Sequence, residues 1–211
     1  MIWTFGDSFS TIWEKMYGVG IQYKKYKGYQ PKIFSDYLAT LLNTDVNQCG
    51  IGGVDNNTIF ECIINNIDTI TTNDIVIIGW TDPSRFRVEK NNKWVTIRHV
   101  KSELELHKFI DTNTLEQLCV NRMSGLYWDE IVNWSKLLTN IFELKGIKVI
   151  FWSPFALRTD IHLKKQLLPK DWYIGTSLNR LREETNNVIN DDHFSESGHK
   201  ELADIFYNKL I

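Results

Sequence analysis

Short apolar runs alternate along the chain with longer segments in which apolar residues recur at helical spacing. Strands are predicted over residues 2–5, 45–49, 74–79 and 148–154. Helices are predicted over 32–42, 56–67 and 128–144, and from about residue 196 onward. The run DIVIIG at 74–79 is continuous and β-branched, which is typical of a strand buried on both faces of a parallel sheet. The alternation predicts an α/β fold with a parallel central sheet and helices on both sides.

Two regions depart from this alternation. The stretch FRVEKNNKWVTIR at 86–98 predicts a β-hairpin around Asn91 and Asn92, as an excursion from the main sheet. Residues 101–145 are expected to be mostly helical, with Gly146 ending the helix, whereas 156–190 show no clear pattern. A chain of 211 residues is long enough for one domain with a sizeable core, so we expect a single domain over 1–211.

The charge balance and the cysteines exclude several classes of protein. Lys and Arg number 24 against 26 Asp and Glu, a formal charge of −2, so neither nucleic-acid nor membrane binding by bulk charge is expected. The Lys/Tyr stretch at 23–29 is interpreted as a solvated loop. Three cysteines without CxxC spacing argue against a disulfide framework and a zinc site. No signal peptide and no membrane-spanning run is recognised, so synthesis and folding are expected in a reducing cytoplasm.

Polar or glycine positions follow the first three predicted strands. Ser8, in GDSFS, lies just past the first strand, Gly53 past the second and Thr81 past the third. The carboxyl ends of parallel strands form the ligand-binding edge of such sheets, so these positions are expected to meet there. The structural alternative is that Asp7 and Ser8 form a tight turn and cap a helix, and that Gly53 is an ordinary turn glycine.

A histidine near the end of the chain has the neighbours that a catalytic base requires. A serine nucleophile needs a base within hydrogen-bond reach, and the base needs an acid to orient it. The stretch NDDHF supplies His193, with Asp191 or Asp192 as the acid. Either aspartate is also a suitable cap for the last helix. Asp7 is interpreted as structural, and His199 receives no role.

Together these motifs, spread from Gly6 to His193, resemble the SGNH (GDSL-type) hydrolases. The resemblance implies a flavodoxin-like three-layer α/β/α sandwich, with Ser8 as nucleophile and His193 as base. The glycine of the second family block falls on Gly53, with Gly52 as the alternative. A one-residue gap before the histidine selects Asp191 as the acid, with Asp192 as the substitute, whereas the commoner two-residue gap would fall on Asn190.

The third family block departs from the pattern. The family has Gly-x-Asn-Asp, whose Asn donates a hydrogen bond into the oxyanion hole, whereas this chain has GWTD, with Thr81 in place of Asn. The resemblance thus implies an oxyanion hole made by Ser8, Gly53 and Thr81. A threonine hydroxyl is shorter and donates one hydrogen bond, so the activity is expected to be weak, specialised or supported by another donor. The stretch IIGWTDPSRF also resembles a phage-type branch of the family.

The resemblance implies a carboxylic ester hydrolase that works through an acyl-enzyme, with O-acetyl groups on carbohydrate as substrate. No metal or organic cofactor is expected, and the expected partner is a small-molecule or carbohydrate ester. Two alternatives stay open: a thioesterase or lipase, and a non-catalytic, virion-associated protein that binds glycans. Trp80, Trp152 and Arg85 lie near strand ends and are candidates to line the substrate cleft. Against this, most of the eight tryptophans are expected in the core.

Overall fold

The computed structural model describes residues 1–12, 24–25, 28–82, 85–90, 93–97, 113–114, 117, 125–154, 173–174 and 193–211. The strands are β1 (Ile2–Phe5), β2 (Val46–Gln48), β3 (Ile75–Gly79), β4 (Phe86–Lys90), β5 (Lys93–Ile97), β6 (Lys148–Trp152) and β7 (Tyr173–Ile174). The helices are the short 3-10 helix η1 (Ser8–Ser10) and the α-helices α2 (Phe34–Leu42), α3 (Asn56–Asn66), α5 (Gly125–Leu144) and α7 (Glu196–Leu210).

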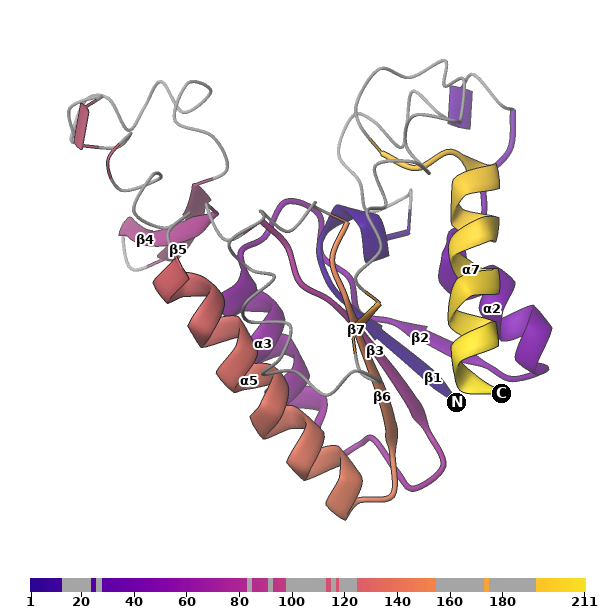
Figure 1. The fold of residues 1–211 in the computed structure, drawn as a ribbon. Helices are drawn as coiled ribbons and strands as arrows, with labels where there is room; N and C mark the ends of the chain where they lie inside the picture. The colour runs from indigo at the N-terminus through magenta and orange to yellow at the C-terminus, as the bar shows by residue number, and fades with distance from the viewer. Residues whose placement is uncertain are drawn as a thin grey trace.

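The central sheet is parallel throughout its described strands. Its order is β2-β1-β3-β6-β7, with β1 in the middle of the first three strands (Figure 1). Phe5 pairs with Ile78, and Gly79 pairs with Trp152, so the carboxyl ends of the strands lie at one edge. This arrangement confirms the predicted α/β class with a parallel central sheet.

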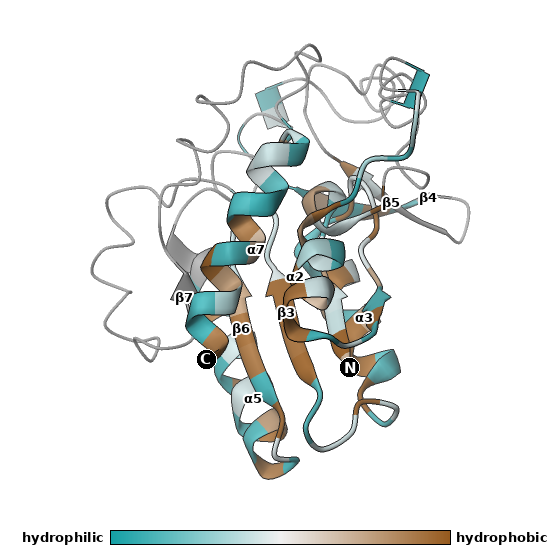
Figure 2. Ribbon diagram, turned by 90° about the vertical axis from the view of Figure 1, so that its right-hand side faces the viewer, coloured by the Kyte–Doolittle hydropathy of each residue, from teal (hydrophilic) through white to brown (hydrophobic). Residues whose placement is uncertain are grey.

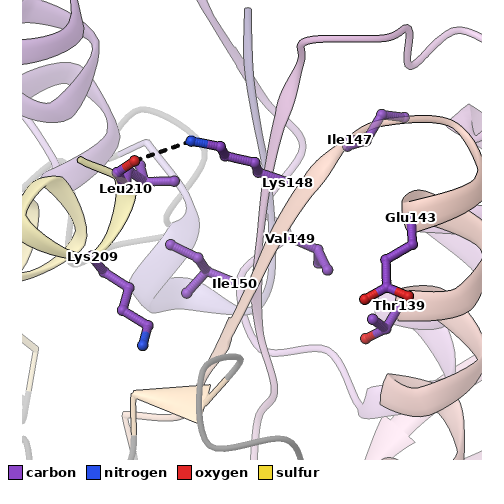
Figure 3. A pocket seen from close by; sticks show the side chains of 8 residues that line it. All are labelled: Thr139, Glu143, Ile147, Lys148, Val149, Ile150, Lys209 and Leu210. Carbon is purple, nitrogen blue, oxygen red and sulfur yellow. Dashed lines mark hydrogen bonds between the residues drawn. The ribbon is translucent and has the colours of Figure 1, made fainter.

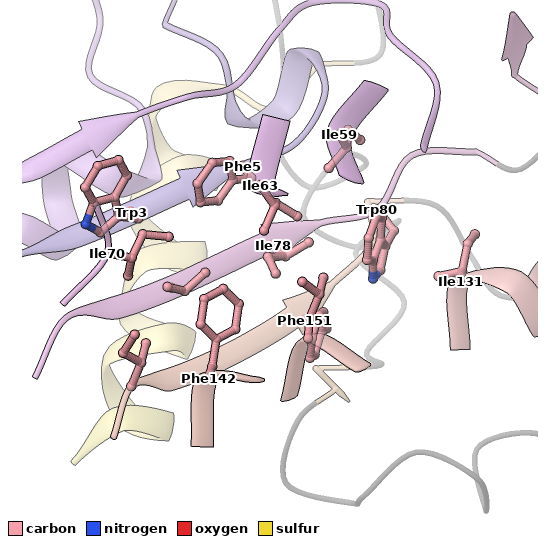
Figure 4. Packing of buried hydrophobic residues seen from close by; sticks show 13 residues of the cluster. Trp3, Phe5, Ile59, Ile63, Ile70, Ile78, Trp80, Ile131, Phe142 and Phe151 are labelled. Atoms are coloured by element: carbon pink, nitrogen blue, oxygen red, sulfur yellow. The ribbon is translucent and has the colours of Figure 1, made fainter. Parts of the chain in front are cut away.

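Helices cover both faces of the sheet. Helices α2 and α7 lie on one side and α3 and α5 on the other (Figure 1). Side chains that alternate along each strand feed two separate cores: Ile77 packs with α2 and α7, whereas Val76 and Ile78 pack with α3 and α5. Aromatic side chains fill much of the second core, as Figure 4 shows for Trp3, Phe5, Phe142 and Phe151. The three-layer α/β/α arrangement is therefore confirmed.

Hydropathy follows this layering. In Figure 2 the central strands β3 and β6 are mostly hydrophobic, whereas α7 carries hydrophilic residues on its outer side. Burial of the strands on both faces explains the continuous apolar run at 74–79. Helix α5 ends at Leu144, and Gly146 follows with a φ of 68°, as predicted for the end of that helix.

The hairpin is present, and it stands apart from the main sheet. Strands β4 and β5 pair antiparallel as a separate two-stranded sheet, while the predicted turn at 91–92 lies outside the described residues. Contacts among the described residues attach the hairpin to α3 and its N-cap: the Thr96 hydroxyl donates to Asp55 (2.8 Å), and Arg87 forms an ion pair with Glu61 (2.6 Å). The sequence did not predict the two-residue strand β7, and most of 101–124 lies outside the described residues.

Candidate functional site

Three segments that follow β1, β2 and β3 converge at the carboxyl edge of the sheet. The backbone N–H of Ile51, in the loop that holds Gly53, donates to the carbonyl of Gly6 (2.9 Å). From the other side, the Thr81 hydroxyl donates to the Asp7 carboxylate (2.6 Å). The structure thus brings together the segments that carry Ser8, Gly53 and Thr81, as predicted from their positions just past three parallel strands.

The turn that carries Ser8 is built by Asp7. The Asp7 carboxylate caps η1 by accepting from the backbone N–H of Phe9 (3.1 Å), while its carbonyl accepts from the N–H of Ser10 (2.9 Å). Asp7 and Ser10 are buried, whereas Ser8 is partly exposed. The expected structural role of Asp7 is therefore present, and the turn leaves Ser8 partly exposed.

Glycines allow this turn to pack closely against its neighbours. A Cβ added at Gly50 would lie 2.2 Å from the carbonyl oxygen of Ser10, and one added at Gly6 would lie 2.4 Å from the Ser10 hydroxyl. Gly53 has a φ of 75°, a left-handed conformation that favours glycine. Close packing and backbone conformation therefore explain the glycines of the loop after β2, whether or not Gly53 also contributes to an oxyanion hole.

Thr81, which was predicted as an oxyanion donor, makes its hydrogen bonds within the protein. Its hydroxyl carries a single hydrogen, and that hydrogen is directed at the Asp7 carboxylate. Its backbone N–H donates to the side chain of Asn56 (2.8 Å), and the Asn56 amide donates back to the Thr81 carbonyl (3.0 Å). Both donors of Thr81 are therefore engaged within the protein in this structure, on Asn56 and Asp7.

The two tryptophans proposed for the cleft also need correction. Trp80 and Trp152 are almost completely buried, at 1% and 0% exposure. The indole N–H of Trp80 donates to Ser135 (2.9 Å), and Trp152 packs edge-on against Phe34. Both side chains belong to the core, because each comes from the end of a strand whose two faces are covered by helices.

Arg85 instead lies beside the turn that carries Ser8. Its Nη1 donates to the Asp7 carboxylate at 3.1 Å and approaches the carbonyl oxygen of Val54 at 3.5 Å. The Asp7 side chain is 2% exposed and the Arg85 side chain 17%. Arg85 was predicted only as a lining residue; its partner, Asp7, lies too far away in the sequence to leave a local signal.

His193 lies next to the same turn. Its ring stacks on Phe9, the residue after Ser8, with 4.9 Å between the ring centroids. The Nε2 atom is buried, and no hydrogen bond joins it to Ser8 in this structure. Active-site hydrogen bonds often form only when substrate is bound, so this geometry is compatible with a base. Asp191, its substitute Asp192, and Asn190 lie outside the described residues.

The start of α7, which follows His193, is anchored by a carboxylate. Glu196 accepts hydrogen bonds from the hydroxyls of Tyr29 (2.5 Å) and Tyr37 (2.9 Å). Burial and the neighbouring Glu196 raise the pKa of Tyr37, so this hydroxyl stays protonated and keeps donating. Ser195 caps the helix by accepting from the N–H of Gly198 (3.1 Å). These contacts hold the segment beside His193 against α2.

A second histidine, His199, lies inside the core formed with α2. Its ring packs 6.3 Å from that of Phe34 and 5.6 Å from that of Phe194, and the residue is 3% exposed. Burial, with a smaller contribution from the charge of His193, lowers the pKa of His199 to about 3. His199 is therefore neutral at ordinary pH.

A pocket of about 470 Å³ lies elsewhere, between the ends of α5 and α7 over the first residues of β6 (Figure 3). Lys148 crosses part of it to donate to the carbonyl of Leu210 (3.1 Å). Because β6 begins there, the pocket lies at the amino ends of the strands, opposite Ser8. Among the described residues that line it there is no serine, cysteine or histidine.

Comparison with known proteins adds no identity. No protein-family model matches the chain, and no curated protein matches it in sequence. Within the described ranges, no cluster of His, Cys, Asp or Glu has the size needed to hold a metal ion. In the same part of the chain, no helix is both long and apolar enough to cross a membrane.

Proposed function

We propose that this protein is a serine esterase in which Ser8 is the nucleophile and His193 the general base. The observation that supports the proposal is the stacking of the His193 ring on Phe9, the residue that follows Ser8 in the chain. Folding thus brings a histidine from the last part of the chain against Phe9, in the same turn as the partly exposed Ser8. A serine next to an imidazole is the pairing that acyl transfer requires.

The reaction proceeds in two steps. His193 removes the hydroxyl proton of Ser8, and the oxygen attacks the ester carbonyl to form a tetrahedral oxyanion. The oxyanion collapses to an acyl-enzyme, and His193 protonates the departing alcohol. Water then attacks the acyl group by the same route and restores Ser8. Asp191, or Asp192 in its place, orients the imidazole, and the route uses no metal or organic cofactor.

The oxyanion is held by the backbone N–H groups of Ser8 and Gly53. The side chain of Thr81 adds nothing, because its hydrogen is directed at Asp7. Removal of one oxyanion donor costs roughly 100- to 1000-fold in rate in other serine hydrolases. We therefore expect slow turnover of unactivated esters. O-acetyl groups on carbohydrate are the proposed substrate class, on the family resemblance; a series of acyl chain lengths separates this class from thioesters and lipids.

The test is hydrolysis of p-nitrophenyl acetate together with labelling by a fluorophosphonate, with the labelled residue located by mass spectrometry. Ser8→Ala is expected to lose both turnover and label. Ser10→Ala is the matched control, because it removes a hydroxyl from the same turn that is fully buried. Turnover that persists in Ser8→Ala would contradict the proposal.

A non-catalytic glycan-binding protein, such as a virion component, is the second candidate. The engagement of both Thr81 donors within the protein favours it, because that site lacks the third oxyanion donor of the resembled family. This candidate predicts no turnover, no label at Ser8, and glycan affinity that Ser8→Ala leaves unchanged.

A further inference from the structure

Arg85 contacts both segments that flank the proposed reaction centre. Its Nη1 lies 3.1 Å from the Asp7 carboxylate and 3.5 Å from the carbonyl oxygen of Val54. Asp7 directly precedes Ser8, and Val54 directly follows Gly53. One guanidinium nitrogen therefore joins the turn and the loop whose backbone N–H groups would hold the oxyanion. Because a guanidinium is planar and rigid, its contacts fix the relative position of the groups that it joins.

The charge of Asp7 gives Arg85 a second effect. The Asp7 side chain is 2% exposed, so water screens its charge poorly. An unpaired carboxylate beside Ser8 would oppose the negative charge that develops on the oxyanion. The Arg85 cation, itself only 17% exposed, pairs with this carboxylate and offsets its field.

We propose that Arg85 is a positioning residue of the esterase site, which aligns the Ser8 turn with the Gly53 loop and neutralises Asp7. This inference rests on the proposed function. In the resembled family an asparagine stands where this chain has Thr81, and here Thr81 and Arg85 both bind Asp7. Arg85 thus acts on the oxyanion hole through the residues that form it and does not contact the substrate itself.

The test compares Arg85→Gln with wild type and with Arg87→Gln. Arg87 is the matched control, because it lies two residues away and pairs with Glu61 on α3. For Arg85→Gln we expect kcat on p-nitrophenyl acetate to fall ~10- to 100-fold while KM changes less than ~3-fold, since the oxyanion exists only in the transition state. The rate of fluorophosphonate labelling should fall in parallel, and Arg87→Gln should match wild type.

Rescue experiments separate positioning from a role in folding alone. Arg85→Ala should regain part of its kcat when guanidinium is added at a concentration too low to denature the protein, whereas the same addition should not help Arg87→Ala. Arg85→Lys keeps the positive charge but lacks the planar guanidinium, so its kcat should lie between those of wild type and Arg85→Gln. In the double variant Asp7→Asn/Arg85→Gln, the losses should be less than additive, because the two residues act through one contact.

The outcomes distinguish this inference from the function on which it rests. If wild type neither turns over ester nor labels at Ser8, the esterase proposal fails and the role of Arg85 fails with it. If wild type reacts and Arg85→Gln reacts equally well, only the role of Arg85 is overturned. The role of Arg85 is also overturned if the kcat of Arg85→Gln falls only in proportion to its unfolded fraction in a thermal melt and guanidinium does not restore the kcat of Arg85→Ala.

Discussion

Burial of His199 predicts a loss of stability in mild acid. Burial and the nearby His193 lower its pKa to about 3 in the folded protein, whereas an unfolded chain has a histidine pKa of about 6.5. Below about pH 6.5, His199 therefore binds a proton in the unfolded state but stays neutral in the folded state. The stability that His199 contributes is fully present above that pH, and it falls steadily as the pH drops toward about 3.

The size of the effect follows from the difference between the two pKa values. Each pH unit in this window changes the free energy of unfolding by about 1.36 kcal/mol per group. Between about pH 7.5 and about pH 4.5, His199 should therefore account for a loss of ~3 kcal/mol in the free energy of unfolding. The aromatic rings of Phe34 and Phe194 lie against the imidazole, which is consistent with burial as the main cause.

The assay is urea unfolding, followed by tryptophan fluorescence, of wild type and His199→Leu at both pH values. On acidification the free energy of unfolding of the variant should fall by ~3 kcal/mol less than that of wild type, whatever its value at neutral pH. The pKa values of Asp74 and Glu61 are lowered, so their contributions are lost at still lower pH and are shared by both proteins. An equal fall in the free energy of unfolding of the two proteins would refute the argument. His193→Leu is the control, because it removes the other histidine of the same region and leaves His199 in place.

Two further substitutions test the packing around the site. Gly50→Ala would place a Cβ 2.2 Å from the Ser10 carbonyl oxygen, so the turn must shift. A thermal melt should show that the free energy of unfolding falls by ~1–3 kcal/mol, and fluorophosphonate labelling of Ser8 should be slower. An unchanged melting midpoint would contradict the close packing of Gly50 against Ser10. Asn56→Ala removes two buried hydrogen bonds to the Thr81 backbone, at a cost of roughly 2–4 kcal/mol in urea unfolding. Asn57→Ala, on the same helical turn, should cost less than ~0.5 kcal/mol, and equal losses would rule out the Asn56 argument.

The pattern of apolar positions was sufficient to predict the layered sheet. A continuous run such as 74–79 is stable only where both faces of a strand are covered, and helical spacing at 56–67 supplies a covering face. Convergence of Ser8, Gly53 and Thr81 could be predicted for a related reason: successive parallel strands end at the same edge. The layered sheet and its shared edge could be predicted without knowledge of any tertiary contact, because both follow from the period of the apolar pattern and the positions of the strands along the chain.

The direction of each side chain at that edge was not predictable in the same way. Thr81 was expected to donate toward a substrate, and the structure turns its hydroxyl to Asp7. Trp80 was expected in the cleft and is buried against α5. His193 could be named from its neighbours, whereas its place against Phe9 depends on how α7 packs.

The sequence alone therefore determined the α/β class, the alternation of strands and helices that makes the sheet parallel, and the edge of the sheet at which the candidate residues gather. Periodicity and residue type carry that information locally. Only the tertiary structure decided that Asp7 is held by Thr81 and Arg85, and that His199 is buried. The register between β1 and β3 brings Asp7 to its two partners, and the packing of α7 on α2 encloses His199. Partners so far apart in the chain are chosen by the packing of whole elements, which no short stretch of sequence encodes.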